Sequence, residues 1–370
     1  MPKTRSSLRH HRELLLTSRR TVVVLMLASA ILLFLCVAVI RRDAIALVTS
    51  ESIDELLKLS ALLVIILVPL SGIYSVMLDF VFWEGWLDGL PDPSHLFAER
   101  SPDISGHRHY IIYLDGIHQS EEDHPPRVSR FLSQLEEGID HESILVKGIE
   151  AYTIMPVALR SDLYSQWFWR SLFSLQEHHP NSLVRFLSAF CVQANNVIKV
   201  GISSDRRYGP VMNYELALKI ARRLESLGFH PSKAVRLVLV GYSGGGEMAI
   251  GTAEILQQLC RVPVQVITVC GVFSGNGALE EINRVAMVVG GKDPVAALGQ
   301  VAYPGRSPLL PLSNWNRWQR KRKLARYEIS GMNHCGHSGP FSDDFSSKVV
   351  DAICRELCMT RQAPIKSGFT

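Results

Sequence analysis

A serine lies between glycines at the point where an apolar run of the sequence ends. Residues 236–250 read RLVLVGYSGGGEMAI, in which the run before the glycines predicts a strand and the residues after them predict a helix. The pattern G-x-S-x-G is formed here by Gly241, Tyr242, Ser243, Gly244 and Gly245. Small residues are needed on both sides of a serine held in a tight strand-to-helix turn, because larger side chains would collide with neighbouring backbone. Ser243 is therefore the candidate nucleophile.

The turn around Ser243 also offers hydrogen-bond donors for a negatively charged oxygen. The first N–H groups of a helix have no acceptor within the helix, and the helix dipole favours anions there. The N–H of Gly244 is the natural first donor to an oxyanion that forms on a carbonyl attacked by the serine.

A nucleophilic serine needs a base and a group that orients the base, and two later turns supply candidates. Asp293 lies near the end of the run RVAMVVGGKDP (284–294), and His334 ends the run YEISGMNH (327–334). Taken singly, Asp293 is typical of a turn or helix cap before Pro294, and His334 of an ordinary loop histidine. Together with Ser243, in this order and after successive predicted strands, they indicate a Ser-His-Asp triad. His337 is an alternative base, and we favour His334 because it comes soonest after its strand.

The elements that must position these residues alternate along the chain. Short β-branched runs separated by longer amphipathic stretches predict a mostly parallel sheet covered by helices. The predicted strands are 110–114, 143–147, 154–158, 197–202, 235–240, 264–269, 285–289 and 325–329. The predicted helices are 128–137, 213–227, 247–260 and 344–358.

With these motifs, residues 108–358 resemble the α/β-hydrolase superfamily. The resemblance implies an α/β-hydrolase fold with helices on both faces of the sheet, and a nucleophile elbow around Ser243. It further implies acyl transfer in which Ser243 attacks an ester-like carbonyl, His334 takes and returns the proton, and Asp293 holds the histidine tautomer. Neither a metal nor an organic cofactor is expected.

The resemblance also implies a second oxyanion donor in the turn after an early strand. That turn reads LDGIH over residues 114–118, with Asp115 where the superfamily often has histidine. The resemblance therefore assigns the second oxyanion donor to the backbone N–H of Ile117. Gly116, which has no side chain, would permit this N–H to approach the oxyanion closely. An Asp-Gly pair is equally typical of a plain turn, and this alternative stays open.

Apolar residues are concentrated near the N-terminus. Residues 21–40 and 59–78 carry no charge, and each run is long enough to span a bilayer as a helix. Cations cluster in residues 1–20, which predicts a cytoplasmic tail and, after two spans, a cytoplasmic domain. A cleaved signal peptide over the first run would instead place the domain outside the cell.

The predicted organisation is therefore an anchored enzyme domain. It comprises a basic tail (1–20), two transmembrane helices (21–86), a linker (87–106), a hydrolase domain (107–360) and a C-terminal tail (361–370).

Composition excludes several other classes of protein. A net charge of +4 without any nucleic-acid-binding motif argues against nucleic acid as a partner. The seven cysteines form no CxxC pair, so neither a zinc site nor a disulfide framework is indicated, and we expect reduced, mostly buried thiols. Cys335, beside His334, is expected to be a packing residue.

Two segments bear on substrate and membrane. The insertion 160–196 contains Trp167 among other aromatic residues and is either a lid or acyl-pocket wall, or a pair of helices packed on the sheet. The stretch from Trp315 to Lys323 interleaves tryptophans with cations, which suits contact with anionic membrane lipids, and a solvated basic loop is the alternative.

The sequence thus predicts a membrane-proximal esterase, lipase or thioesterase acting on a small-molecule or lipid ester. A catalytically inactive binding or scaffold protein on the same fold is the competing class. A serine peptidase is a third, because amide and ester cleavage use the same triad.

Overall fold

A computed structural model describes residues 108–117, 124–152, 174–175, 180, 182–205, 209–231, 234–275, 282–295 and 303–362. The chain divides into two compact units. The first unit contains residues 1–92 and 152–215, and the second contains residues 93–151 and 216–370. The sheet and all the predicted site residues belong to the second unit.

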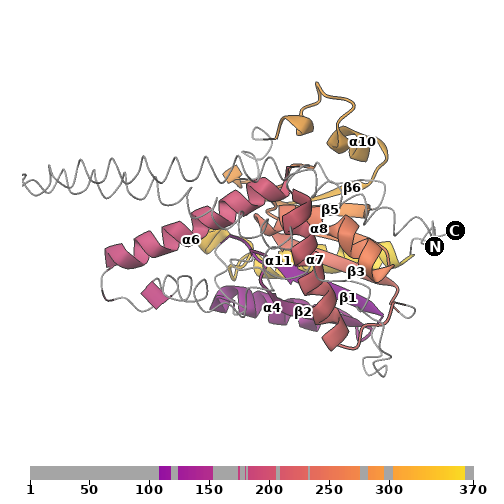
Figure 1. The fold of residues 1–370 in the computed structure, drawn as a ribbon, viewed down its shortest axis with the longest axis horizontal. Coiled ribbons are helices and arrows are strands. Elements are labelled where there is room, and N and C mark those ends of the chain that lie inside the picture. Colours follow the sequence, from indigo (N-terminus) through magenta and orange to yellow (C-terminus); the bar gives the residue numbers. More distant parts are fainter. Residues whose placement is uncertain are drawn as a thin grey trace, which may run out of the picture. The chain divides into compact units, whose positions relative to one another are not determined.

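The second unit is built on a six-stranded sheet in the order β2-β1-β3-β4-β5-β6, in which every pair of neighbours is parallel (Figure 1). The strands are β1 (His109–Leu114), β2 (Ser143–Ile149), β3 (Arg236–Tyr242), β4 (Val264–Val269), β5 (Ile282–Gly290) and β6 (Leu324–Ile329). Strands β1 and β4 are buried along their whole length, as expected for a parallel sheet covered on both faces. The edge strand β6 instead turns Arg326 and Glu328, paired at 2.9 Å, toward solvent.

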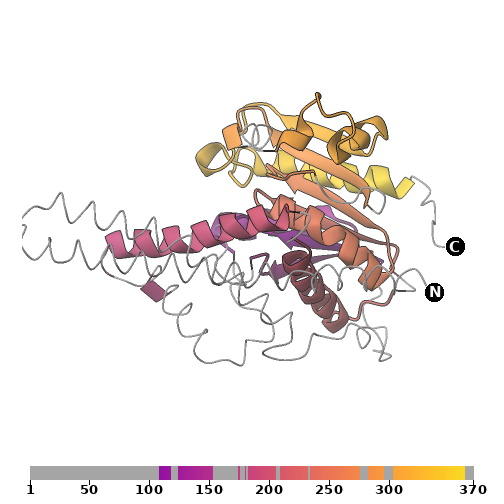
Figure 2. The same ribbon diagram turned by 45° about the horizontal axis from the view of Figure 1, so that its top comes forward.

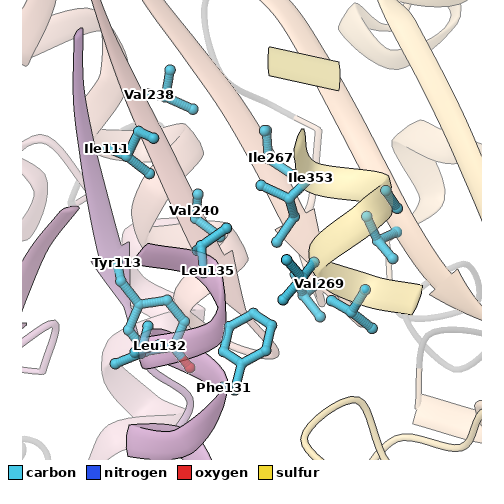
Figure 3. Packing of buried hydrophobic residues seen from close by; sticks show 14 of the residues in the cluster. Ile111, Tyr113, Phe131, Leu132, Leu135, Val238, Val240, Ile267, Val269 and Ile353 are labelled. Carbon is cyan, nitrogen blue, oxygen red and sulfur yellow. The ribbon is translucent and has the colours of Figure 1, made fainter. Parts of the chain in front are cut away.

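Two helices, α4 (Pro126–Gly138) and α11 (Ser346–Gln362), pack on each other over one face of this sheet. Figure 3 shows alternate residues of the strands, such as Ile111, Val240 and Val269, beneath Phe131 of α4 and Ile353 of α11. This alternation follows from the two-residue repeat of a strand, which sends successive side chains to opposite faces.

Helix α8 (Gly245–Cys260) covers the other face (Figure 2). It packs on β3 and β4, and its Gly246 lies against Thr268, whose neighbours Ile267 and Val269 face α4 and α11. The sheet therefore carries helices on both faces, which is the α/β class predicted from the sequence. The described part of the chain also contains α6 (Ser182–Ser203), α7 (Gly209–Ser226) and the short α10 (Asn314–Arg320), with one 3₁₀ turn at Pro304–Arg306 and another at Gly336–Ser338.

The strand order creates a switch point between β1 and β3. Strand β2 pairs with one edge of β1, and the next strand along the chain, β3, pairs with the opposite edge of β1. In open α/β sheets, ligands bind outside the carboxyl ends of the strands where such a reversal occurs. Asp115 and Gly116 follow β1 at this point, and Ser243 follows β3.

Most of the predicted elements are confirmed within one to four residues at their ends. The strand predicted over 197–202 is wrong, because this β-branched run forms the last turns of helix α6. There Val197 is exposed while Asn196 and Lys199 are buried, which is a helical rather than an alternating pattern. The strand predicted over 154–158 lies outside the described residues.

The predicted transmembrane helices fall on a part of the chain that the structure does not describe. Both predicted spans, the basic tail and the linker lie before residue 108. Within the described ranges, no helix is both long enough and apolar enough to cross a bilayer.

Candidate active site

Ser243 has a left-handed backbone conformation, with φ of 50°, in the turn between β3 and α8. For a residue other than glycine this conformation costs roughly 1–2 kcal/mol, and it persists only where the surroundings hold it. The Ser243 N–H donates to the carbonyl of Val269 at 3.0 Å, and its carbonyl accepts from Val272 at 2.9 Å and from Gly246 at 3.0 Å. The serine is therefore fixed by the end of β4 and by the loop that follows it.

The glycines around Ser243 are required by close approaches of backbone. A Cβ on Gly241 would lie 2.3 Å from the carbonyl oxygen of Gly245. A Cβ on Gly245 would lie 2.5 Å from the carbonyl oxygens of both Leu114 and Asp115. The G-x-S-x-G pattern thus has a steric cause here, because it lets the first turn of α8 pack against the end of β1.

The side chains of Ser243, His334 and Asp293 form a continuous chain of hydrogen bonds. The serine Oγ lies 2.9 Å from His334 Nε2, and His334 Nδ1 lies 3.1 Å from Oδ1 and 3.0 Å from Oδ2 of Asp293. Because Nδ1 faces a carboxylate, we assign the ring proton to Nδ1, which leaves Nε2 as the acceptor for the serine hydroxyl. The Asp293 side chain is fully buried, and 13% of the His334 side chain is exposed. This arrangement can move a proton from the hydroxyl to the imidazole.

The loops that carry Asp293 and His334 are bonded to each other. Asp293 follows β5, and the Lys292 N–H donates to the carbonyl of Met332, which follows β6, at 3.0 Å. A Cβ on Gly290 would lie 2.4 Å from this same carbonyl oxygen. The glycine after β5 therefore permits the contact that brings the carboxylate and the imidazole together.

His337 is placed away from this chain of hydrogen bonds. It is exposed, and its Nδ1 lies 3.5 Å from Nη2 of Arg127. Of the two histidines that the sequence offered as a base, only His334 is in hydrogen-bonding contact with Ser243 and Asp293 among the described residues.

Both predicted oxyanion donors lie in segments that border Ser243. Gly244 is the residue before the first turn of α8, where N–H groups lack acceptors within the helix. A Cβ on Gly116 would lie 3.4 Å from the Ser243 Cβ, so the turn after β1 runs directly beside the serine. Ile117 is the next residue of this turn.

A second buried acid and histidine pair, which the sequence did not predict, holds the turn after β1. Asp115 Oδ2 lies 3.0 Å from His124 Nδ1, and both side chains are 7% exposed. Asp115 Oδ1 accepts from the Gly116 N–H at 2.8 Å and from the Tyr113 hydroxyl at 3.1 Å. His124 Nε2 in turn accepts from Gly148 of β2 at 3.4 Å. The one signal in the sequence was Asp115 itself, in the Asp-Gly pair after the first predicted strand.

The side chain of Cys270 lies close to the Asp293 carboxylate and to the His334 ring. Its sulfur, a carboxylate oxygen of Asp293 and a ring nitrogen of His334 all lie within 4.8 Å of one another, and sulfur, nitrogen and oxygen donors suit Zn²⁺. Burial, together with the nearby Asp293, raises the pKa of the Cys270 thiol. The Asp293 carboxylate and the His334 ring already bond to each other. The cluster is therefore better described as part of the hydrogen-bonded chain.

The cysteine predictions hold only in part. Cys260 and Cys270 are buried and reduced, as expected. Cys335 and Cys358 are exposed, so the packing role expected for Cys335 is wrong. Cys335 belongs to the exposed stretch that follows His334.

Comparison with known proteins finds no family model that matches this chain and no curated protein that matches it.

Proposed function

We propose that this protein is a membrane-anchored serine hydrolase of the α/β-hydrolase type that cleaves an ester or thioester. The observation that carries the proposal is the contact of Ser243 Oγ with His334 Nε2 at 2.9 Å, continued from Nδ1 to the buried Asp293. A nucleophile bonded to a base, and a base bonded to an orienting acid, are the geometric signature of such an enzyme.

In the proposed reaction, Ser243 Oγ attacks the carbonyl carbon of the substrate while His334 Nε2 accepts the hydroxyl proton. The oxyanion that forms is stabilised by the N–H groups of Gly244 and Ile117. His334 then protonates the leaving alcohol or thiol, which leaves an acyl group on Ser243. A water molecule, deprotonated by His334, attacks this acyl group and releases the acid. Asp293 remains ionised and stabilises the imidazolium in both steps.

The choice of fold type is supported by where the three residues occur. Serine, aspartate and histidine follow β3, β5 and β6 in the chain order that α/β-hydrolases use, all at the carboxyl edge of the sheet. The positive φ of Ser243 and the glycines on either side agree with a strained turn that exposes the hydroxyl.

The proposed substrate is a small-molecule or lipid ester, and the membrane anchor rests on the two uncharged runs before residue 80. In this proposal the domain faces the cytoplasm, because the cations precede the first run. An inactive scaffold would have no need of a bonded serine, histidine and aspartate, which is why we favour an enzyme.

The test uses the full-length protein purified in detergent and offered esters of increasing acyl length, a thioester and a peptide amide. Replacing Ser243 with alanine should lower turnover of the preferred substrate by at least about 10³-fold, because loss of one triad member removes most of the rate enhancement. Ser226→Ala, at the exposed end of α7, is the matched control and should retain full activity. Equal turnover in wild type and Ser243→Ala would refute the proposal, and a folded wild type inert toward every substrate would favour the scaffold.

A further inference from the structure

The segment between the 3₁₀ turn at Pro304–Arg306 and helix α10 exposes three leucines. We call residues 307–313 the leucine loop. Leu309 is 88% exposed, Leu310 is 47% exposed and Leu312 is 76% exposed. Single exposed leucines are ordinary, but several together on one short loop indicate a surface that contacts another apolar phase or molecule.

Hydrogen bonds hold the leucine loop in a defined shape. The side-chain amide of the buried Asn316 donates to the carbonyls of Ser307 at 2.8 Å and Leu310 at 2.9 Å, and to the Ser313 hydroxyl at 3.0 Å. Backbone bonds from Leu310 to Ser307 and from Ser313 to Leu310 close two further turns. The exposure of the leucines is therefore built into the fold of this loop.

The tryptophans of this region face inward and anchor the loop. Trp315 and Trp318 are both buried, so their rings are not available for contact with lipid, and membrane contact of the stretch from Trp315 to Lys323 stays a prediction. The Arg306 guanidinium lies 4.2 Å from the Trp315 ring centre, and Trp315 also packs against Phe273 and Gly275 after β4. The apolar side chains left for contact with a membrane are the leucines.

The cations of α10 lie on its outer face. Trp315 and Trp318 occupy one side of the helix, and the spacing of Arg317 and Arg320 places both on the opposite, exposed side. Arg322 follows the helix and is also exposed. None of these three arginines forms an ion pair within the part of the chain that the structure describes. In Figure 1 this segment lies at the outer edge of the second unit, beyond β5 and β6.

We propose that the leucine loop and the arginines of α10 form a docking surface for an anionic phospholipid membrane. The leucines would enter the boundary between headgroups and acyl chains, while the arginines bind lipid phosphates. A lipid surface is favoured over a protein partner because the apolar part is a protruding loop rather than a groove. The charge around it is also of one sign, with no acidic residue between Arg306 and Tyr327. The proposal is independent of the catalytic function.

The test follows hydrogen exchange of backbone amides in the full-length protein reconstituted with vesicles. One set of vesicles contains only neutral phosphatidylcholine, and the other also contains anionic phosphatidylglycerol. Amides of the leucine loop should exchange at least about fivefold more slowly on the anionic vesicles, because each cation near such a surface strengthens adsorption by about that factor. Raising the salt concentration should reduce this protection.

Two variants separate the contributions of the loop and the charges. Leu309→Ser with Leu312→Ser should abolish the protection, and Arg317→Glu with Arg320→Glu should weaken docking at least about 25-fold. Val197→Ser, which changes an exposed apolar residue of α6, is the matched control and should leave the protection intact. All three should turn over a small soluble ester at the wild-type rate, because none touches the site.

Equal exchange on the two kinds of vesicle would overturn the proposal. Protection that survives the loss of both leucines would also overturn it, and so would protection that appears only when another protein is added.

Discussion

The hydroxyl of Tyr242 donates a hydrogen bond to the backbone carbonyl of His334 at 2.9 Å, and the two rings stack with centres 5.8 Å apart. The residue before the candidate nucleophile thus holds the backbone of the candidate base. Burial raises the pKa of Tyr242, so the phenol stays protonated and keeps donating through neutral and alkaline pH. The loop after β6 is positioned by the turn after β3, across two intervening strands.

The two histidines of the NHCGH stretch should differ sharply when replaced. His334→Ala removes the group that bonds Ser243 Oγ and should lower turnover at least about 10³-fold. His337→Ala removes only an exposed ring beside Arg127 and should change turnover less than about threefold, in keeping with an exposed change away from the site. Steady-state turnover of the two purified variants makes the comparison. The reverse ranking would move the base to His337.

Asp293→Asn should impair catalysis while leaving the fold intact. An amide donates where the carboxylate accepted, so it favours the histidine tautomer that carries its proton on Nε2 and cannot take the serine proton. The expected fall in kcat is about 10⁴-fold.

Asp343→Asn is the control for this change, because Asp343 is an exposed carboxylate that pairs with the exposed Arg130 at the surface. The turnover of both variants is measured alongside their circular dichroism. A kcat for Asp293→Asn within tenfold of wild type would argue against the orienting role.

Gly245→Ala should destabilise the second unit. Its new Cβ would lie 2.5 Å from the carbonyl oxygens of Leu114 and Asp115, so the start of α8 must move away from β1. Overpacking of this kind costs roughly 1–3 kcal/mol or more.

Gly201→Ala in α6 is the matched control, because a Cβ there meets nothing within 4 Å among the residues that the structure describes. The control should be neutral or gain up to about 1 kcal/mol from better helix propensity. The free energy of unfolding in urea distinguishes the two variants. An unchanged midpoint for Gly245→Ala would contradict the close packing of α8 on β1.

Glu247, in the first turn of α8, should make stability depend on pH. Burial raises the pKa of its carboxyl to about 7, although Ser274 donates both its N–H and its hydroxyl to it and Arg306 is nearby. Between the ordinary carboxyl pKa and about 7, the folded state holds a proton that the unfolded state has lost. The stabilisation from this group is therefore present at low pH, falls as the pH rises through that window and is lost above it.

Glu247→Gln removes this titration. The unfolding free energy of wild type should fall relative to that of the variant between pH 5 and about pH 7, by on the order of 3 kcal/mol. Above about pH 7 the difference between the two proteins should stay constant. Urea unfolding at a series of pH values measures it. Parallel curves for the two proteins across this range would show that Glu247 does not titrate there.

The most accurate sequence predictions concern short apolar strands that are buried on both faces of the sheet. Strand β4 matches its predicted bounds, Val264–Val269, because a short apolar run buried on both faces carries a strong local signal. The run 197–202 has the same β-branched character, yet it forms part of a helix because the longer amphipathic pattern around it prevails. Local preference alone could not separate these two cases.

The meeting of Ser243, Asp293 and His334 was predictable because each follows a strand of one parallel sheet. The pairing of Asp115 with His124 was not, since it depends on the path of a loop between β1 and α4 that no periodic pattern describes. The inward-facing tryptophans of α10 were missed for a similar reason, because a seven-residue helix carries too little pattern to show which face is buried. The catalytic roles themselves stay predictions.

Labelling with a fluorophosphonate, followed by mass spectrometry of the digested protein, tests the central claim most directly. This reagent bonds covalently to a serine whose hydroxyl is activated by a neighbouring base. We expect one adduct on the full-length protein, located on Ser243, and no adduct on folded Ser243→Ala. An adduct on a different serine, or equal labelling of Ser243→Ala, would contradict the account.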